Sequence, residues 1–266
     1  MERISINGIE IAYEIRGAGA PLVMIHGAQG DQTMLAGLAS DFADGFRVMT
    51  FDQRGSGLSD KPDMPYSIAM LADDTAALMD HLRMSPAHVI GVSMGGMIAL
   101  ELVLRHPGNV RSLILGCTTA GGSKAIPIGG EAFQKAYAKE PMSAEERARA
   151  LAEAAFSKGF LAEHPEVITS MIEARRSRPI DSTALAHRLK AALEHDTFDR
   201  LGKINCPTLV ITGRDDALVA WQNSQILAEG IKGAKQVVLE PAGHCFWLER
   251  PKESRDAIAQ FLAAQK

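Results

Sequence analysis

Apolar and polar residues alternate in blocks along most of this chain. Short runs rich in Val, Ile and Leu are separated by stretches in which apolar residues recur at helical spacing. The apolar runs lie near 22–26, 46–51, 87–92, 110–115, 208–212 and 235–239, and the helical patterns near 33–43, 68–83, 96–106, 219–229 and 251–264. Strands that are apolar on both faces are typical of a parallel sheet covered by helices. The pattern predicts an α/β protein with a mostly parallel, doubly wound sheet, which binds ligands at the carboxyl ends of its strands.

The N-terminal region follows a different pattern. Residues 3–6 and 9–15 alternate apolar and polar side chains, and Asn7-Gly8 between them is a type I′ turn signal. These two segments are therefore expected to form an antiparallel hairpin ahead of the parallel strands.

The segment 119–199 interrupts the alternation of strands and helices. It contains no convincing strand, and its pattern indicates several short helices. Ser143 and Glu146 have the spacing of a capping box, and Val167, Ile168 and Met171 fall on one helical face. We expect a core of residues 1–118 and 200–266, with the helical segment 119–199 inserted after the sixth strand.

Composition and charge mainly exclude classes of partner. The 266 residues are 46% hydrophobic, and the formal net charge of −4 gives no argument for binding nucleic acid or a charged membrane surface. Three cysteines far apart in sequence are typical of reduced, intracellular thiols. The chain start lacks the pattern of a secretory signal, and no apolar run reaches the ~20 residues needed to cross a bilayer. The protein is therefore expected to be soluble and cytoplasmic.

Ser93 lies in the most informative stretch, Gly-Val-Ser-Met-Gly-Gly at residues 91–96. This stretch joins a predicted strand to a predicted helix, and Gly-x-Ser-x-Gly at such a junction is the nucleophile elbow. The turn strains the serine backbone, so the residues two positions away, Gly91 and Gly95, must be very small. It also places the hydroxyl at a helix N-terminus, where backbone N–H groups point toward developing negative charge.

A serine nucleophile of this kind needs an acid and then a histidine further along the chain. Seven of the eight histidines lie before residue 200, which leaves His244, in the loop after the predicted strand 235–239. No Asp or Glu lies between Asn109 and Glu131, so an acid after the strand 110–115 is ruled out. The remaining candidates are Asp215 and Asp216, directly after the strand 208–212.

Together these motifs resemble the α/β-hydrolase superfamily, in its capped, esterase-like branch. Two further stretches match in register: His-Gly-Ala at 26–28 resembles the oxyanion loop, and Asp-Gln-Arg-Gly-Ser-Gly-Leu-Ser-Asp at 52–60 resembles the turn after the fourth strand. The resemblance runs from about residue 3 to the C-terminus. It implies the α/β-hydrolase fold, with segment 119–199 as a lid that shapes the substrate pocket. By analogy with the Gly-x-x-Asp of the family, it favours Asp216 over Asp215.

The resemblance also implies a mechanism and a set of roles. Ser93 would attack an ester or lactone carbonyl, His244 would accept its proton, and Asp216 would orient the imidazole. The backbone N–H groups of Ala28 and Met94 are the candidate oxyanion donors. His26 is expected to orient the oxyanion loop rather than to act as a base.

The remaining patterns indicate no cofactor. The other histidines lack metal-ligand spacings, and the glycines fit neither a dinucleotide fingerprint nor a phosphate loop, so neither a metal nor a nucleotide is expected. Arg175, Arg176 and Arg178 are read as a solvated cap edge in preference to a carboxylate site. The expected partner is a small ester or lactone. A ligand receptor with slow turnover, a carbon–carbon bond hydrolase and a cofactor-free perhydrolase share the serine triad and stay open, as does the oligomeric state.

Overall fold

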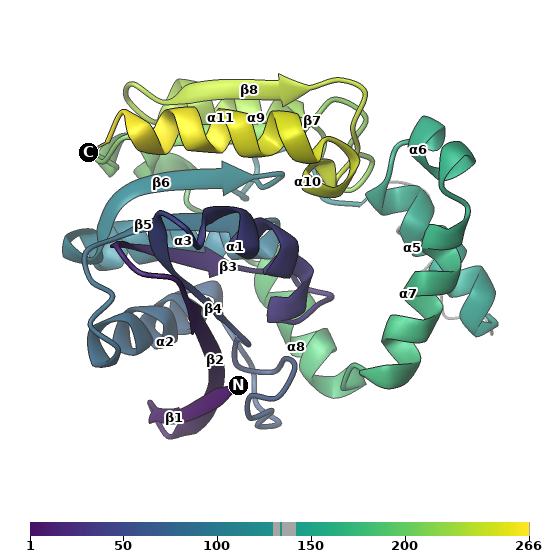
Figure 1. Ribbon diagram of the computed structural model, residues 1–266, viewed down its shortest axis with the longest axis horizontal. Helices are drawn as coiled ribbons and strands as arrows, with labels where there is room; N and C mark the ends of the chain where they lie inside the picture. Colours follow the sequence, from purple (N-terminus) through teal and green to yellow (C-terminus); the bar gives the residue numbers. More distant parts are fainter. Residues whose placement is uncertain (130–133, 135–141, 266) are drawn as a thin grey trace.

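One twisted sheet organises the molecule. The computed structural model describes residues 1–129, 134 and 142–265. Within them, eight strands form a single sheet in the order β1-β2-β4-β3-β5-β6-β7-β8 (Figure 1). The strands are β1 (Glu2–Ile6), β2 (Ile9–Arg16), β3 (Ala20–Ile25), β4 (Phe46–Phe51), β5 (Ala87–Val92), β6 (Val110–Gly116), β7 (Thr208–Gly213) and β8 (Lys235–Leu239).

The pairing confirms the mostly parallel sheet and the hairpin at its edge. β1 pairs antiparallel with β2, and Ile6 opposite Ile9 closes the turn. Asn7 and Gly8 both have positive φ (49° and 77°), as a type I′ turn requires. β2 pairs antiparallel with β4, and all the other pairs are parallel. The carboxyl ends of the parallel strands therefore lie along one edge of the sheet.

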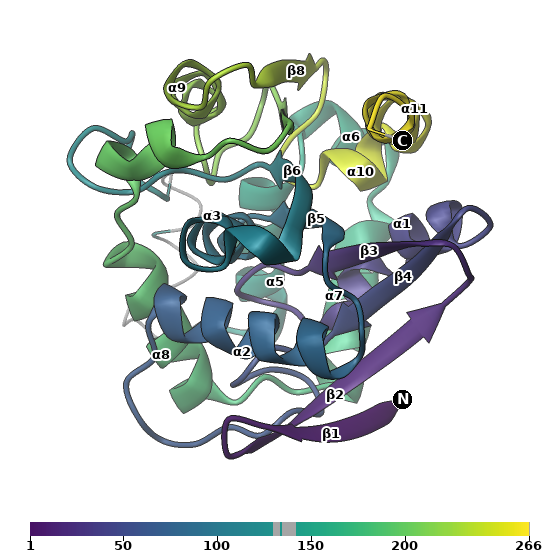
Figure 2. The ribbon, with the colours of Figure 1, turned by 90° about the vertical axis from the view of Figure 1, so that its left-hand side faces the viewer.

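Helices cover both faces of the sheet, so the core has two halves (Figure 2). On one side, Leu100 and Leu227 are fully buried in a cluster built on α2, α3 and α9. On the other side, Leu38 and Ile258 pack in a cluster built on α1 and α11. These helices are α1 (Ala36–Phe42), α2 (Ile68–His81), α3 (Met94–Arg105), α9 (Gln222–Gly230) and α11 (Pro251–Ala263).

The predicted helical segment 33–43 corresponds to the 3₁₀ turn η1 (Gln32–Leu35) followed by α1. Three other short elements were not expected from the pattern: the 3₁₀ turns η2 (Pro107–Asn109) and η3 (Phe198–Lys203), and the helix α10 (Phe246–Glu249). α10 follows directly on the loop that carries His244, so it belongs to the neighbourhood of the site.

The segment 119–199 contains four described helices, as its apolar pattern suggested. The helices are α5 (Ala144–Ala155), α6 (Lys158–Glu163), α7 (Glu166–Ser177) and α8 (Ser182–Leu193). α5, α6 and α7 lie beyond the tips of β6 and β8, and α8 turns back toward the core (Figure 1); these four helices are called the helical arm below. Residues 130–133 and 135–141 of the segment lie outside the described part of the chain. The capping box is present: the Ser143 side chain accepts from the N–H of Glu146, whose carboxylate accepts from the Ser143 N–H.

None of the helices that the structure describes is both long and apolar enough to cross a membrane.

Candidate active site

Ser93 occupies a strained turn between β5 and α3. Its backbone has φ 57° and ψ −124°, a conformation that costs a non-glycine residue on the order of 1–3 kcal/mol. A Cβ on Gly91 would come within 2.3 Å of the Gly95 carbonyl oxygen, and a Cβ on Gly95 within 2.1 Å of the Ile25 carbonyl oxygen. Both positions therefore require glycine, for the reason the elbow motif predicts. Ser93 is half-exposed to the adjoining cavity.

His244 and Asp216 form a buried pair at the same edge of the sheet. The Nδ1 atom of His244 lies 2.8 Å from Oδ2 of Asp216, whose side chain is fully buried. The other carboxylate oxygen of Asp216 accepts from the backbone N–H groups of Leu218 and Val219, at 2.9 and 2.8 Å. A carboxylate held in this way fixes the imidazole with its hydrogen on Nδ1, which leaves Nε2 free to accept a proton.

Asp215 does not reach the histidine. Its side chain is exposed, and its backbone N–H donates to the Ala242 carbonyl at 2.8 Å. Of the two acids that the chain order left open, the structure therefore brings only Asp216 to His244.

Cys117 is a neighbour of His244 that the sequence analysis passed over. Its Sγ lies 3.8 Å from Nε2 of His244, and it follows directly on β6 with φ 39°. The sequence carries no local signal for this contact, because the two residues are 127 positions apart. The possible ligand atoms of Cys117, Asp216 and His244 all lie within 4.8 Å of one another, a spacing that could hold a metal ion. Burial raises the pKa of the Cys117 thiol, however, and so disfavours the thiolate that metals bind.

The loop after β3 packs directly against the serine. A Cβ on Gly27 would lie 3.1 Å from the Ser93 Cβ, so the peptides that follow β3 face the elbow. Ala28 lines the cavity, and Met94 occupies the first turn of α3. These are the two residues whose backbone N–H groups were predicted to hold the oxyanion.

His26 is part of the support of this loop. Its Nδ1 lies 2.8 Å from the Gly27 carbonyl oxygen, and its Nε2 lies 3.1 Å from Oγ of Ser56. A carbonyl only accepts, so Nδ1 carries the hydrogen. Gln53 donates its side-chain amide to the His26 carbonyl at 2.6 Å. Burial is the main cause that lowers the pKa of His26 to about 3, so the ring stays neutral, in agreement with a role in orientation.

The turn after β4 is braced by charged side chains. Asp52 accepts from the backbone N–H groups of Gln32 and Leu58, at 2.8 and 2.7 Å, and so joins this turn to η1. Arg54 forms a buried ion pair with Asp74 of α2, with N–O distances of 2.7 and 2.9 Å. These acids and bases are already engaged in structural contacts and offer no second catalytic pair.

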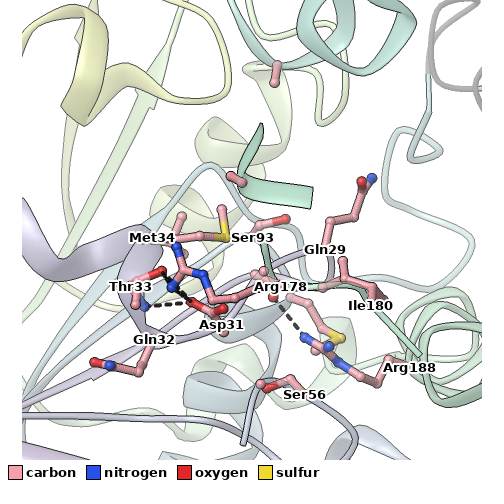
Figure 3. A pocket seen from close by; sticks show the side chains of 18 of the residues that line it. Gln29, Asp31, Gln32, Thr33, Met34, Ser56, Ser93, Arg178, Ile180 and Arg188 are labelled. Carbon is pink, nitrogen blue, oxygen red and sulfur yellow. Dashed lines mark hydrogen bonds and ion pairs between the residues drawn. The ribbon is translucent and has the colours of Figure 1, made fainter. Parts of the chain in front are cut away.

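A largely apolar cavity of about 560 Å³ lies between the elbow and the helical arm. This volume is in the range of pockets that enclose small organic ligands. Core and arm both contribute apolar walls: Met34, Met97, Leu151, Phe156, Met171 and Trp247. Figure 3 shows the polar side chains around it, with Ser93 among them.

The three arginines predicted to form a solvated edge of the arm are exposed, as expected, and two of them also border the cavity. Arg175 and Arg178 line the cavity, and Arg178 donates to Oγ1 of Thr33 at 2.5 Å and lies 3.4 Å from Oδ1 of Asp31 (Figure 3). The sequence analysis missed Arg188 altogether. This residue of α8 also lines the cavity and is completely buried.

Known proteins resemble the chain over almost its whole length. The family model for the alpha/beta hydrolase fold matches residues 20–251. A 2-hydroxymuconate semialdehyde hydrolase of Pseudomonas sp. (strain CF600) is 32% identical, covering 96% of this chain and 91% of its own. The putative non-heme bromoperoxidase BpoC of Mycobacterium tuberculosis is 32% identical, covering 97% and 99%. The crystal structure of the enol-lactonase from Burkholderia xenovorans LB400 has a TM-score of 0.86 at 28% identity, covering 98% of this chain and all of that one.

Proposed function

The chain belongs to the α/β-hydrolase family, and we propose that it is a serine hydrolase that cleaves a carboxylic ester or lactone through an acyl-enzyme on Ser93. The observation that carries the proposal is the buried contact of 2.8 Å between Asp216 and His244, at the cavity that Ser93 lines. An imidazole oriented by a buried carboxylate, on the same cavity as an elbow serine, is the arrangement that activates a hydroxyl for acyl transfer.

In the proposed first step, Nε2 of His244 takes the proton of the Ser93 hydroxyl as Oγ attacks the carbonyl carbon. Asp216 stabilises the imidazolium that forms, and the carbonyl oxygen becomes an oxyanion held by the N–H groups of Ala28 and Met94. The tetrahedral intermediate collapses, and His244 returns its proton to the leaving alkoxide. His244 then takes a proton from a water molecule that attacks the acyl-Ser93, and returns it to Oγ of Ser93 as the bond from Oγ to the acyl carbon breaks and the carboxylic acid is released.

The cavity favours a small substrate of mainly apolar character. Its walls are mostly aliphatic, aromatic and thioether side chains, and its volume is about 560 Å³. We propose that the segment 119–199 acts as the cap that sets the size of this pocket, because α5, α7 and α8 all contribute to its lining. A small-molecule substrate also agrees with the names of the relatives, which include an enol-lactonase.

A turnover experiment separates this function from its alternatives. Purified protein should turn over p-nitrophenyl esters and simple lactones many times per molecule, and Ser93→Ala should abolish this, since loss of a triad serine can cost about a million-fold in kcat. One slow turnover that leaves a persistent adduct would instead indicate a ligand receptor. Peracid formation from a carboxylic acid and peroxide, without ester cleavage, would indicate the perhydrolase. The absence of both reactions would direct the search to carbon–carbon bond substrates.

A further inference from the structure

Arg188 reaches from the helical arm into the loops of the core. Its side chain starts on α8, has no exposed surface, and contacts two backbone carbonyls. Nη2 donates to the Gly27 oxygen at 3.0 Å, and Nη1 lies 3.5 Å from the Gly55 oxygen. Figure 3 shows Arg188 on the same cavity as Ser93. Burying a guanidinium this deeply costs free energy unless its N–H groups are hydrogen-bonded.

The Gly27 carbonyl that Arg188 contacts belongs to the peptide that carries the N–H of Ala28. The carbonyl of Gly27 and the N–H of Ala28 are two ends of the same planar unit. That N–H is one of the two oxyanion donors of the proposed function. The same carbonyl also accepts from Nδ1 of His26 at 2.8 Å. Two donors on one carbonyl oxygen fix the rotation of the peptide, and hence the direction in which its N–H points.

We propose that Arg188 is a positioning residue for the oxyanion hole: its guanidinium aligns and polarises the Gly27–Ala28 peptide so that the Ala28 N–H binds the oxyanion. The inference rests on the proposed function. A charged donor on the carbonyl draws electron density from the peptide nitrogen and makes its N–H a stronger donor, since hydrogen bonds in a chain polarise one another. Arg188 acts on the oxyanion through this peptide and needs no contact with substrate.

Through Arg188, the helical arm contributes to the proposed catalysis. Arg188 is on α8, whereas the peptide that it holds is on the loop after β3. The peptide that carries the Ala28 N–H is therefore held by both Arg188 and His26 only when the arm is docked on the core. The other support, His26, comes from the core itself and remains when Arg188 is removed, so some of the alignment should persist.

The test compares three variants on neutral esters. Arg188→Met should lower kcat by about 10- to 100-fold, less than the 10²- to 10³-fold loss typical of a missing oxyanion donor, and should leave KM within about threefold. The affinity for a neutral alkyl boronic acid, whose tetrahedral adduct imitates the intermediate, should fall by the same factor as kcat/KM. Arg188→Lys should recover part of the loss. Lys190→Met is the matched control, because it removes a cation of the same helix that pairs with Glu194 and does not line the cavity, and it should keep the wild-type kcat.

Several results would overturn the proposal. One is an Arg188→Met enzyme with unchanged kcat on neutral esters, whose loss of activity is confined to substrates that carry a carboxylate. Another is a rise in KM alone. The third is a boronic acid affinity that does not fall in step with kcat/KM. Thermal melting of each variant checks folding, and Arg188→Lys replaces Arg188→Met if the latter does not fold. An active Ser93→Ala variant would refute the proposed function itself, whereas an inactive one beside a fully active Arg188→Met refutes only the role of Arg188.

Discussion

Asp215 and Asp216 are neighbours in sequence with opposite surroundings. Asp216 is buried against His244, and Asp215 is exposed. We expect Asp216→Asn to lower kcat by about ten-thousand-fold, because an amide favours the wrong imidazole tautomer. Asp215→Asn is the matched control and should retain nearly full activity. Steady-state kinetics on one ester measures kcat for both variants. A large loss of kcat in Asp215→Asn, with an active Asp216→Asn enzyme, would reverse the assignment.

Two buried histidines make stability depend on pH. Burial is the main cause that lowers the pKa of His26 to about 3 and of His195 to about 4, against 6.5 in the unfolded chain. Below pH 6.5 the unfolded chain therefore binds protons at these histidines, whereas the folded chain does not. Their contribution to the free energy of unfolding is complete above this pH and is lost on acidification. Each histidine contributes a slope of up to about 1.4 kcal/mol per pH unit in the free energy of unfolding.

His195→Gln isolates one of these contributions without touching the site. Between about pH 6 and pH 4.5, the variant should lose less stability than the wild type, because the glutamine does not titrate. Urea unfolding at a series of pH values measures both curves. Parallel curves would show that His195 accepts a proton in the folded state as readily as in the unfolded chain.

At the residue scale, sequence reasoning found what a motif or the chain order specifies. The elbow marked Ser93, and the order of the triad left His244 and an Asp pair. It missed Arg188 and Cys117, because contacts between residues 27 and 188, or 117 and 244, have no local pattern. It placed Arg178 on a solvated edge, where the residue is indeed exposed, but did not find that the residue also borders the cavity. A charge within a helical pattern does not reveal which surface the helix will meet.

At the scale of elements, Glu249 of α10 joins the helical arm to the histidine loop. Its carboxylate accepts from the Gly243 N–H at 2.8 Å, and from the N–H and hydroxyl of Ser157, the N-cap of α6. The Cys245 N–H donates to the Ala155 carbonyl at 2.9 Å. The residues on both sides of His244 are thus bonded at the boundary of the arm, so the position of the base depends on this junction.

Removing the Glu249 carboxylate should make the position of His244 less well defined. We expect Glu249→Ala to lower kcat about tenfold and to destabilise the fold by about 2 kcal/mol, because it leaves N–H groups without their acceptor. Ser157→Ala is the control: it removes one hydroxyl and keeps the bond to Gly243, so its kcat should change less than threefold. Kinetics and thermal melts on both variants make the comparison. A Glu249→Ala enzyme with full kcat and a lowered melting temperature would reduce the junction to a structural role.

The elements themselves were largely predictable from the sequence. The central strands are buried on both faces and bounded by turns, so periodicity located them, and Asn7-Gly8 specified the hairpin. The four-residue α10 and the 3₁₀ turns η2 and η3 were missed, because such short segments carry no period. The strand order, with β4 between β2 and β3, was not predicted, since pairing between distant segments leaves no local signal.

For the whole molecule, the cavity between core and arm is the feature that should determine substrate choice. Each added methylene of an acyl chain should contribute up to ~0.8 kcal/mol until the pocket is full, so kcat/KM should rise and then fall along an ester series. Met171→Ala and Leu151→Ala enlarge the cavity and should move the optimum to longer chains. Leu161→Ala is the control, since it packs in the core cluster without lining the cavity. Identical profiles, merely scaled, would show that the arm does not set specificity.

Covalent labelling tests whether Ser93 is the nucleophile of a Ser–Asp–His hydrolase. The protein is treated with a fluorophosphonate, digested, and mapped by mass spectrometry, with Asp216→Asn as a parallel sample. We expect one adduct, on Ser93, formed far more slowly in the variant because its imidazole is misoriented. An adduct on another residue, or a protein that loses ester hydrolysis without any label on Ser93, would contradict this assignment.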